Sequence, residues 1–273
     1  MNKPAKKIQP VFFIGCGPGD PELITVKGKR RLEEADVIVY AGSLVKEKVL
    51  QYAKKEADIY NSASMALEEI MKIVVDAARA RKKVVRLHSG DPTLYSALRE
   101  QADILDKEKI PYEVIPGVSS AFASAAALKR ELTMPEITQT VIFTRLEGRT
   151  PVPEQERLSL LARHQATMCI FLSIGMIDNV IKELKKGYPE DTPAAVVYRA
   201  TWEDERIIKG RLKDIANKVK KEGIKRQAMI IVGKTLGQGT VPAGSKQGAK
   251  YKEGQKSKLY DRNFEHGYRK KKV

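Results

Sequence analysis

Short apolar runs alternate with amphipathic segments along the first half of the chain. The clearest helical pattern covers residues 64–81, where Leu67, Ile70, Met71 and Val74 recur at spacings of three and four. Apolar runs of strand length are predicted at 11–15, 37–40, 58–60, 84–87 and 112–115. Helices are predicted at 26–34 (with Thr25 as cap), 45–54, 64–81, 94–106 and 119–130. Strands that alternate with helices predict a parallel sheet covered on both faces.

The pattern changes after residues 131–137, which contain Met134 and Pro135 and are predicted to be a linker. Strands are predicted at 138–144, 168–173, 194–199, 206–209 and 228–233. Helices are predicted around Ile177–Leu184 and from residue 212 to 219, with Gly223 as a C-terminal cap. The 194–199 and 206–209 strands are joined by a short polar connection, so we expect them to be antiparallel and the second sheet to be mixed.

The predicted fold class is therefore α/β, with two α/β domains and an active-site cleft between them. The sheet of the first domain is expected to be mainly parallel and that of the second mixed. The predicted domains are residues 1–131 and 132–236. Residues 237–273 are predicted to be a basic, partly mobile tail, since lysines and arginines recur along it and residues 237–255 are rich in Gly, Lys and Gln.

Composition narrows the class of protein. The chain has 273 residues and a formal net charge of +16, which favours anionic partners such as nucleic acid or a polycarboxylate. Its two cysteines, Cys16 and Cys169, are too few and too far apart for a disulfide framework or a zinc site. The longest apolar stretch without charge, 114–128, is shorter than the roughly 20 residues that cross a bilayer. No signal-peptide core is recognisable, so a cytoplasmic protein without a membrane segment is expected.

A glycine-rich loop, GCGPGDP at 15–21, follows the first predicted strand and precedes a helix. This placement suggests a dinucleotide site, but the third glycine of that motif is replaced by Asp20. Pro18 and Pro21 also lack the N–H groups that cradle phosphates. No acidic residue follows Tyr40 to bind a ribose. A nucleotide-binding loop is therefore disfavoured, and a tight structural turn remains the alternative.

Two more loops lead from a predicted strand into a helix. The one at 87–93 contains Gly90, which permits close backbone approach, and Asp91, which can accept hydrogen bonds. The one at 115–120 contains Ser119, which can cap the next helix. Loops that follow parallel strands meet at one edge of the sheet, where open α/β folds bind ligands. Small residues, hydroxyls and one carboxylate suit a ligand without phosphate.

Hydrolytic and metal-binding signatures are missing from the sequence. The three histidines show no H-E-x-x-H spacing, and there is no G-x-S-x-G motif. His88 ends a strand, where a structural role is the more common one.

Three motifs in this order, GCGPGDPELIT at 15–25, SGDP at 89–92 and IPGVSS at 115–120, resemble the tetrapyrrole (corrin/porphyrin) methyltransferase superfamily. The resemblance runs from about residue 11 to 233. It implies an enzyme that uses S-adenosylmethionine. Two further stretches, 132–153 and 257–269, are similar to the branch that methylates C-11 of precorrin-4 or cobalt-precorrin-4 in cobalamin (vitamin B12) biosynthesis. The resemblance to this superfamily also implies a homodimer.

The resemblance assigns residues as well. The residues that it places around S-adenosylmethionine are Pro18, Ser89, Gly90, Asp91, Leu94, Ser119, Ser120, Leu172, Ala200 and Met229. A tetrapyrrole of this kind carries many carboxylates, so Arg145 and Arg149 are the candidate substrate-binding residues. Cobalt would come within the substrate, and no metal site on the protein is expected. No catalytic base is assigned, although Tyr95 or Glu147 could serve.

Several alternatives remain open at this point. The chain could methylate uroporphyrinogen III or another precorrin position. An RNA-directed methyltransferase or an RNA-binding protein would share the fold and charge. With one Trp and 6% aromatic residues, the chain gives only weak support for a nucleic acid partner. A dinucleotide-dependent enzyme lacks its motif, and a non-enzymatic scaffold would not need three convergent loops.

Overall fold

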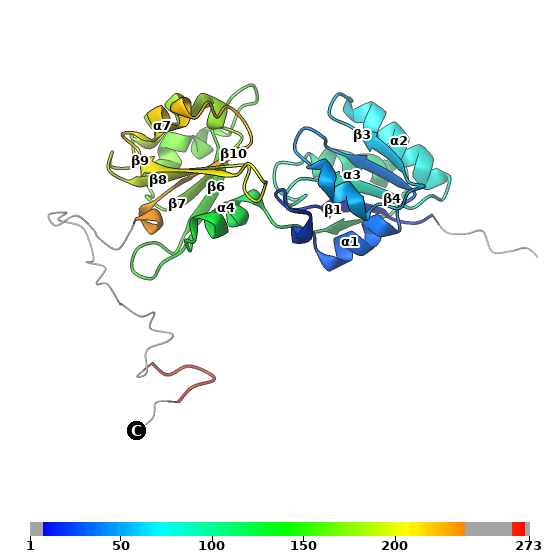
Figure 1. The fold of residues 1–273 in the computed structure, drawn as a ribbon, viewed down its shortest axis with the longest axis horizontal. Coiled ribbons are helices and arrows are strands. Elements are labelled where there is room, and N and C mark those ends of the chain that lie inside the picture. Colours follow the sequence, from blue (N-terminus) through cyan, green and yellow to red (C-terminus); the bar gives the residue numbers. More distant parts are fainter. Residues whose placement is uncertain (1–7, 238–263, 271–273) are drawn as a thin grey trace, which may run out of the picture. The chain divides into compact units, whose positions relative to one another are not determined.

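The computed structural model describes residues 8–237 and 264–270 (Figure 1). The chain divides into two compact units by its internal contacts. Unit 1 comprises the residues up to Ala127 together with Arg199–Arg206, and unit 2 comprises the rest. A boundary drawn along the sequence alone does not reveal that a short segment from the second half of the chain belongs to the first unit. The predicted tail, 237–273, lies for the most part outside the described residues.

Unit 1 is built on a five-stranded parallel sheet, as the sequence predicts. Its order is β3-β2-β4-β1-β5. The strands are β1 (Val11–Gly15), β2 (Val37–Tyr40), β3 (Asp58–Asn61), β4 (Val84–His88) and β5 (Tyr112–Ile115). β1 and β4 lie inside the sheet and all their residues are buried. β1 has no polar side chain, whereas β4 carries the buried Arg86 and His88.

Helices cover both faces of this sheet. They are α1 (Val26–Glu33), α2 (Leu67–Arg79) and α3 (Leu98–Lys107), and a further helix, α4 (Ser120–Leu128), follows β5. One apolar cluster contains Leu32 of α1 with residues of β1, β2 and β4. The opposite cluster contains Ile70 of α2 and Leu105 of α3 with other residues of β1, β2 and β4. Thr25 caps α1 as predicted, since its hydroxyl accepts a hydrogen bond from Gly28 N at 3.1 Å.

Two helices of unit 1 differ from the sequence prediction. Residues 45–54 contain the 3₁₀ helix η2 (Glu47–Tyr52) instead of an α-helix. The helix predicted from residue 94 begins at Leu98, because Tyr95 and Ala97 both have a φ of +54° and Thr93 binds the Asp91 side chain. Side-chain and backbone bonds of this loop replace the first helical turn.

Unit 2 contains a mixed sheet of order β6-β7-β10-β8-β9. Its strands are β6 (Val141–Arg145), β7 (Thr167–Phe171), β8 (Pro193–Tyr198), β9 (Arg206–Arg211) and β10 (Ala228–Val232). β6 and β7 are parallel, whereas β10 runs antiparallel to both β7 and β8. The prediction of a mixed second sheet is thus confirmed.

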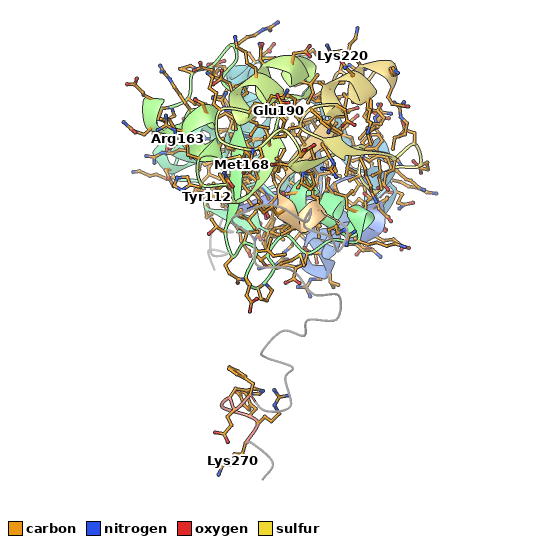
Figure 2. The ribbon with its side chains drawn as sticks, turned by 90° about the vertical axis from the view of Figure 1, so that its left-hand side faces the viewer. Tyr112, Arg163, Met168, Glu190, Lys220 and Lys270 are labelled. Carbon is orange, nitrogen blue, oxygen red and sulfur yellow. The ribbon has the colours of Figure 1, made fainter. Side chains whose placement is uncertain are left out.

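Helices of unit 2 pack on this sheet around one apolar cluster. They are α5 (Leu158–Ala162), which the sequence reading did not include, α6 (Ile177–Leu184) and α7 (Ile215–Lys221). Gly223 follows α7 with a φ of +66°, as expected of a C-terminal cap. Met168 is fully buried in β7, whereas Lys220 extends outward from α7 (Figure 2). Short 3₁₀ helices also occur: η1 (Pro21–Leu23) in unit 1, and η3 (Glu154–Glu156), η4 (Ile174–Met176) and η5 (Lys234–Leu236) in unit 2.

Within the described ranges, no helix combines the length and the apolar character that crossing a membrane requires. The same residues contain no cluster of three or more His, Cys, Asp or Glu side chains arranged to hold a metal ion.

Candidate functional site

The three predicted loops meet at one edge of the unit 1 sheet. They follow the neighbouring strands β4, β1 and β5, whose register places Gly15 beside His88 and Ile14 beside Ile115. The loops are joined by backbone bonds: Gly90 N donates to Gly17 O at 2.8 Å, and Gly17 N donates to Gly90 O at 3.3 Å. Parallel strands in register therefore bring three segments distant in sequence into contact.

Glycines make this contact possible. A Cβ on Gly15 would lie 2.5 Å from Gly90 O, and one on Gly117 would lie 2.2 Å from the same oxygen. Both distances are shorter than van der Waals contact, and the atom approached is backbone. Gly90 itself has a φ of +63°, and a Cβ there would have only ordinary contacts with Ser119 and Ser120. The loops interlock through their main chains, and at Gly90 it is the backbone conformation that favours glycine.

Asp91 fastens the second loop to the third. One oxygen of its carboxylate accepts from Gly117 N at 2.9 Å, and the other accepts from Thr93 N at 2.8 Å. Burial raises the pKa of Asp91, but the hydrogen bonds from Thr93 and Gly117 outweigh burial and hold this pKa below its ordinary value. Asp91 is therefore an ionised group that shapes the loops, whatever else it contacts.

The other predicted residues of unit 1 lie around these glycines. Ser119 is buried, and its Oγ accepts a hydrogen bond from Ala121 N at 3.3 Å in the first turn of α4. Pro18, Ser89, Leu94 and Ser120 are half-buried in the three loops. Together with Gly90 and Asp91 they form a small polar surface with few bulky side chains.

Two buried titratable residues, His88 and Cys16, lie where β4 and β1 lead into these loops. His88 is 4% exposed, and among the residues that the structure describes its Nε2 has no hydrogen-bond partner. Burial, with a contribution from the charge of Arg86, lowers the pKa of His88 to about 3, so the imidazole is neutral at physiological pH. Burial raises the pKa of the Cys16 thiol to about 12. These groups are placed to pack, which agrees with the structural interpretation of His88.

Arg86 was not singled out from the sequence, where it is one residue of a predicted strand. Its buried guanidinium donates to Gln101 Oε1 at 3.0 Å and to Ser62 Oγ at 3.1 Å. Gln101 Nε2 in turn donates to Ala97 O at 3.1 Å. A charged residue inside an otherwise apolar strand is the signal that could have drawn attention to this chain of contacts.

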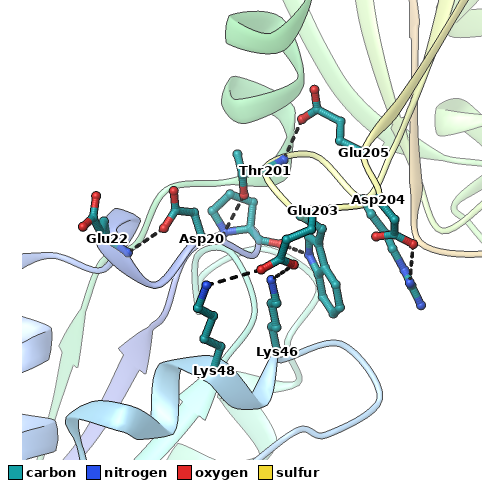
Figure 3. A network of polar contacts seen from close by, with 11 residues as sticks. Asp20, Glu22, Lys46, Lys48, Thr201, Glu203, Asp204 and Glu205 are labelled. Atoms are coloured by element: carbon teal, nitrogen blue, oxygen red, sulfur yellow. Dashed lines mark hydrogen bonds and ion pairs between the residues drawn. The ribbon is translucent and has the colours of Figure 1, made fainter.

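The segment Arg199–Arg206 adds a fourth element to the glycine loops of unit 1. Ala200, a predicted cofactor contact, is buried in it. Two neighbours that the sequence reading did not select bind the first loop: Thr201 Oγ1 accepts from Asp20 N at 2.9 Å, and Trp202 Nε1 donates to Pro18 O at 2.8 Å (Figure 3). No local sequence signal announces these contacts.

In unit 2, three of the predicted residues lie at one edge of the mixed sheet. Arg145 ends β6 and pairs with Phe171, directly before Leu172. Met229 lies near the start of β10, next to Ile230, which pairs with Ile170 of β7. Leu172 is 63% exposed and has a φ of +54°. The left-handed region is uncommon for a residue with a side chain, although other residues of this chain, such as Lys129 and Gln165, also adopt it.

The two candidate arginines differ in their surroundings. Arg145 donates to Thr150 O at 3.2 Å and to Pro151 O at 2.7 Å, so part of its guanidinium closes its own loop. Arg149 is exposed in that loop. A guanidinium has five N–H donors, so Arg145 retains capacity for a carboxylate.

Residues 10–216 match the family model of tetrapyrrole (corrin/porphyrin) methylases. The chain belongs to this family.

Relatives within the family are close. A cobalt-precorrin-4 C(11)-methyltransferase of Methanocaldococcus jannaschii is 61% identical over 261 residues, which cover 95% of this chain and 96% of that protein. The crystal structure of a cobalt precorrin-4 methyltransferase, a cobalamin biosynthetic enzyme, matches with 48% identity and a TM-score of 0.82 over 84% of this chain and 96% of that one. A uroporphyrin-III C-methyltransferase of Thermus thermophilus, solved with S-adenosylhomocysteine, matches with 30% identity and a TM-score of 0.71 over 85% of this chain and 96% of that one.

Proposed function

We propose that this methylase uses S-adenosylmethionine to methylate C-11 of precorrin-4 or of its cobalt form in cobalamin biosynthesis. The observation that carries the proposal is the order of similarity within the family. Identity is 61% and 48% to the two precorrin-4 enzymes, but 30% to the uroporphyrin-III enzyme. The match to the M. jannaschii enzyme extends over nearly the whole of both chains, so the similarity is not confined to the cofactor motifs.

The residues of unit 1 suit the proposed cofactor. S-adenosylmethionine carries no phosphate, and the loops offer small residues, hydroxyls, main-chain groups and the ionised Asp91. Gly90 has a φ of +63°, and a Cβ there would lie 3.7 Å from Ser119 Cα and from Ser120 N, so the glycine brings the second loop close to the third. Pro18, Ser89, Leu94 and Ala200 complete the proposed contacts on this unit.

The remaining contacts are proposed for unit 2. Leu172 and Met229 are the predicted cofactor contacts, and the exposure of Leu172 supports an apolar contact for a ligand. Arg145 and Arg149 are proposed to bind substrate carboxylates, since paired charges of this kind give strong, directed hydrogen bonds.

The proposed reaction asks little of acid–base chemistry. S-adenosylmethionine supplies an activated methyl group on its sulfonium. The protein has to hold donor and acceptor carbons in line and to exclude water. Neutral His88 and protonated Cys16 are consistent with loops that bind and orient without proton transfer.

The deciding experiment is titration of the purified protein with S-adenosylhomocysteine by calorimetry, followed by turnover of precorrin-4 with and without cobalt. Micromolar binding and methylation at C-11, read by NMR of the product, are expected. Uroporphyrinogen III serves as the competing substrate, and NAD as the competing cofactor. Methylation of uroporphyrinogen III in preference to precorrin-4 would overturn the regiochemistry, whereas tight binding of NAD alone would overturn the methyltransferase assignment.

We further propose a cytoplasmic homodimer without a nucleic acid partner. Light scattering coupled to size exclusion should give twice the chain mass of 30.5 kDa. The same protein should bind RNA only weakly, with an affinity that disappears at physiological salt. A monomer, or salt-resistant RNA binding, would count against these two points.

A further inference from the structure

The first glycine loop of unit 1 depends on outside support. Pro18 and Pro21 have no N–H with which to bond within it. Around Gly19 two main-chain groups are instead held by the segment Arg199–Arg206: Asp20 N donates to Thr201 Oγ1 at 2.9 Å, and Pro18 O accepts from Trp202 Nε1 at 2.8 Å. These contacts span more than 180 positions of the sequence.

The indole ring of Trp202 also packs directly on this loop. A Cβ added to Gly19 would lie 2.1 Å from Cδ1 and 2.2 Å from Nε1 of the ring. The ring therefore occupies the place where any other residue at position 19 would have its side chain. The hydrogen bond from Nε1 to Pro18 O and the packing of the ring against Gly19 therefore both act on the Pro18–Gly19 peptide.

The supporting segment is held by hydrogen bonds within itself. Trp202 N donates to Arg199 O at 2.9 Å, and Thr201 N donates to a carboxylate oxygen of Glu205 at 2.7 Å. Arg199 and Thr201 have φ values of +47° and +72°. The latter is costly for a β-branched residue, and it persists because surrounding bonds hold it. This conformation places the Thr201 hydroxyl where it meets Asp20 N.

Ion pairs link the segment to the η2 region. Glu203 pairs with Lys46 and, at 3.3 Å, with Lys48, both from the η2 region (Figure 3). The Lys46 ammonium lies 5.3 Å from the centre of the Trp202 ring, and the Arg199 guanidinium lies 4.8 Å from it. Cations over an indole face stabilise its position. The tryptophan is thus held between the glycine loop and a set of charges.

We propose that Trp202 and Thr201 are positioning residues for the methyl donor: they fix the peptide bonds on either side of Gly19, so that the Pro18 contact is preformed before S-adenosylmethionine binds. This inference rests on the function proposed above. A loop that already has its bound conformation binds a ligand more tightly, because less conformational entropy is lost on binding. Their loss is expected to weaken cofactor binding without changing the rate of methyl transfer in the saturated enzyme.

The first test measures the loop itself, without any ligand. Hydrogen exchange is followed in the peptide that contains the Asp20 amide, in wild type, Trp202→Phe and Thr201→Val. Trp202→Phe removes the Nε1 donor but keeps a ring, and Thr201→Val removes the hydroxyl at nearly constant shape. Exchange of Asp20 N–H should accelerate about tenfold or more in Thr201→Val, and Thr201→Ser should restore most of the protection.

The control is Lys72→Gln, which breaks an exposed ion pair with Asp76 on α2, away from the loop. It should leave exchange of the loop at the wild-type rate. Unchanged exchange in both Trp202→Phe and Thr201→Val would overturn the proposal, because the loop would then be rigid without them.

The second test measures binding in the same folded variants, each checked by thermal unfolding. Affinity for S-adenosylhomocysteine should fall about three- to tenfold in Trp202→Phe, and KM for S-adenosylmethionine should rise in parallel with kcat within about twofold. Faster exchange with unchanged affinity for S-adenosylhomocysteine would mean that Arg199–Arg206 only stabilises the loop, and it would refute the positioning role. If the wild type fails to bind S-adenosylhomocysteine, the proposed function falls and the positioning role with it, while the exchange data still decide whether the loop is held.

Discussion

The loop-bearing edges of the two sheets are built on different principles. In unit 1 three parallel strands end together, and each is followed by a short loop, so the edge is made of main chain that touches main chain. In unit 2 the edge combines the ends of β6 and β7 with the beginning of the antiparallel β10. Side chains such as Arg145 and Leu172 determine what that edge presents.

The difference teaches which kind of site a sequence motif can announce. Main-chain contact requires glycine, and glycine at a strand end is visible in the sequence as a motif. An edge whose surface consists of side chains has no comparable sequence motif, because each of its residues looks like an ordinary strand residue in the sequence. Substitutions should accordingly be severe in unit 1 and selective in unit 2.

The largest effect is expected from Gly117→Ala. Its Cβ would approach Gly90 O to 2.2 Å, and neither backbone can move without disturbing a strand end. We expect a loss of about 3 kcal/mol or more in the free energy of unfolding, together with loss of S-adenosylhomocysteine binding. Urea titration and calorimetry measure the two.

The matched change in unit 2 is Gly148→Ala. There the nearest atom is Met176 Cε at 3.3 Å, the end of a flexible side chain. Stability should change by about 0.5 kcal/mol or less. Equal costs at the two glycines would contradict the contrast between main-chain and side-chain edges.

A selective effect is expected from Arg145→Met. Loss of a charged hydrogen-bond donor to the substrate should raise KM for precorrin-4 about tenfold or more, with S-adenosylhomocysteine affinity unchanged. Steady-state kinetics and calorimetry separate the two. Arg99→Met, at an exposed site on α3 of unit 1, is the control. An unchanged KM would mean that Arg145 serves only to close its loop through Thr150 and Pro151.

A smaller effect concerns pH. His88 has a pKa of about 3 in the folded protein because it is buried, against an ordinary value of 6.5. Between pH 6.5 and 3, His88 is therefore protonated in the unfolded chain and neutral in the folded protein. The stability associated with neutral His88 is complete above pH 6.5 and is lost as pH falls toward 3. Between pH 7 and 5 the wild type should lose about 2 kcal/mol more than His88→Gln. Parallel pH profiles of the two proteins would place His88 in a more solvated site.

The smallest effect is an expected absence of reaction. Cys16 in unit 1 and Cys169 in unit 2 are buried, and burial raises the pKa of each thiol to about 12. At pH 8 a disulfide reagent should find no fast-reacting thiol in the native protein and both thiols in guanidinium. Rapid labelling of one thiol alone would show that its unit opens more readily than the other.

Sequence reasoning predicted the strands of both sheets and the convergence of the three glycine loops. It placed the start of α3 too early, because Asp91 and Thr93 compete with helical bonds in a way that spacing does not reveal. It missed Arg86 inside β4 and the contacts of Thr201 and Trp202. Those contacts join positions far apart in the chain, and only the folded arrangement brings them together.

Trp202 is the only tryptophan of the chain. Its indole N–H is bonded to the glycine loop at Pro18 O, and two cations lie over its ring. Ultraviolet excitation at the red edge of protein absorption therefore interrogates a single site, at the loop proposed to receive the methyl donor. The protein carries its own fluorescent reporter, and occupancy of that loop can be followed by the wavelength and lifetime of its emission without any label.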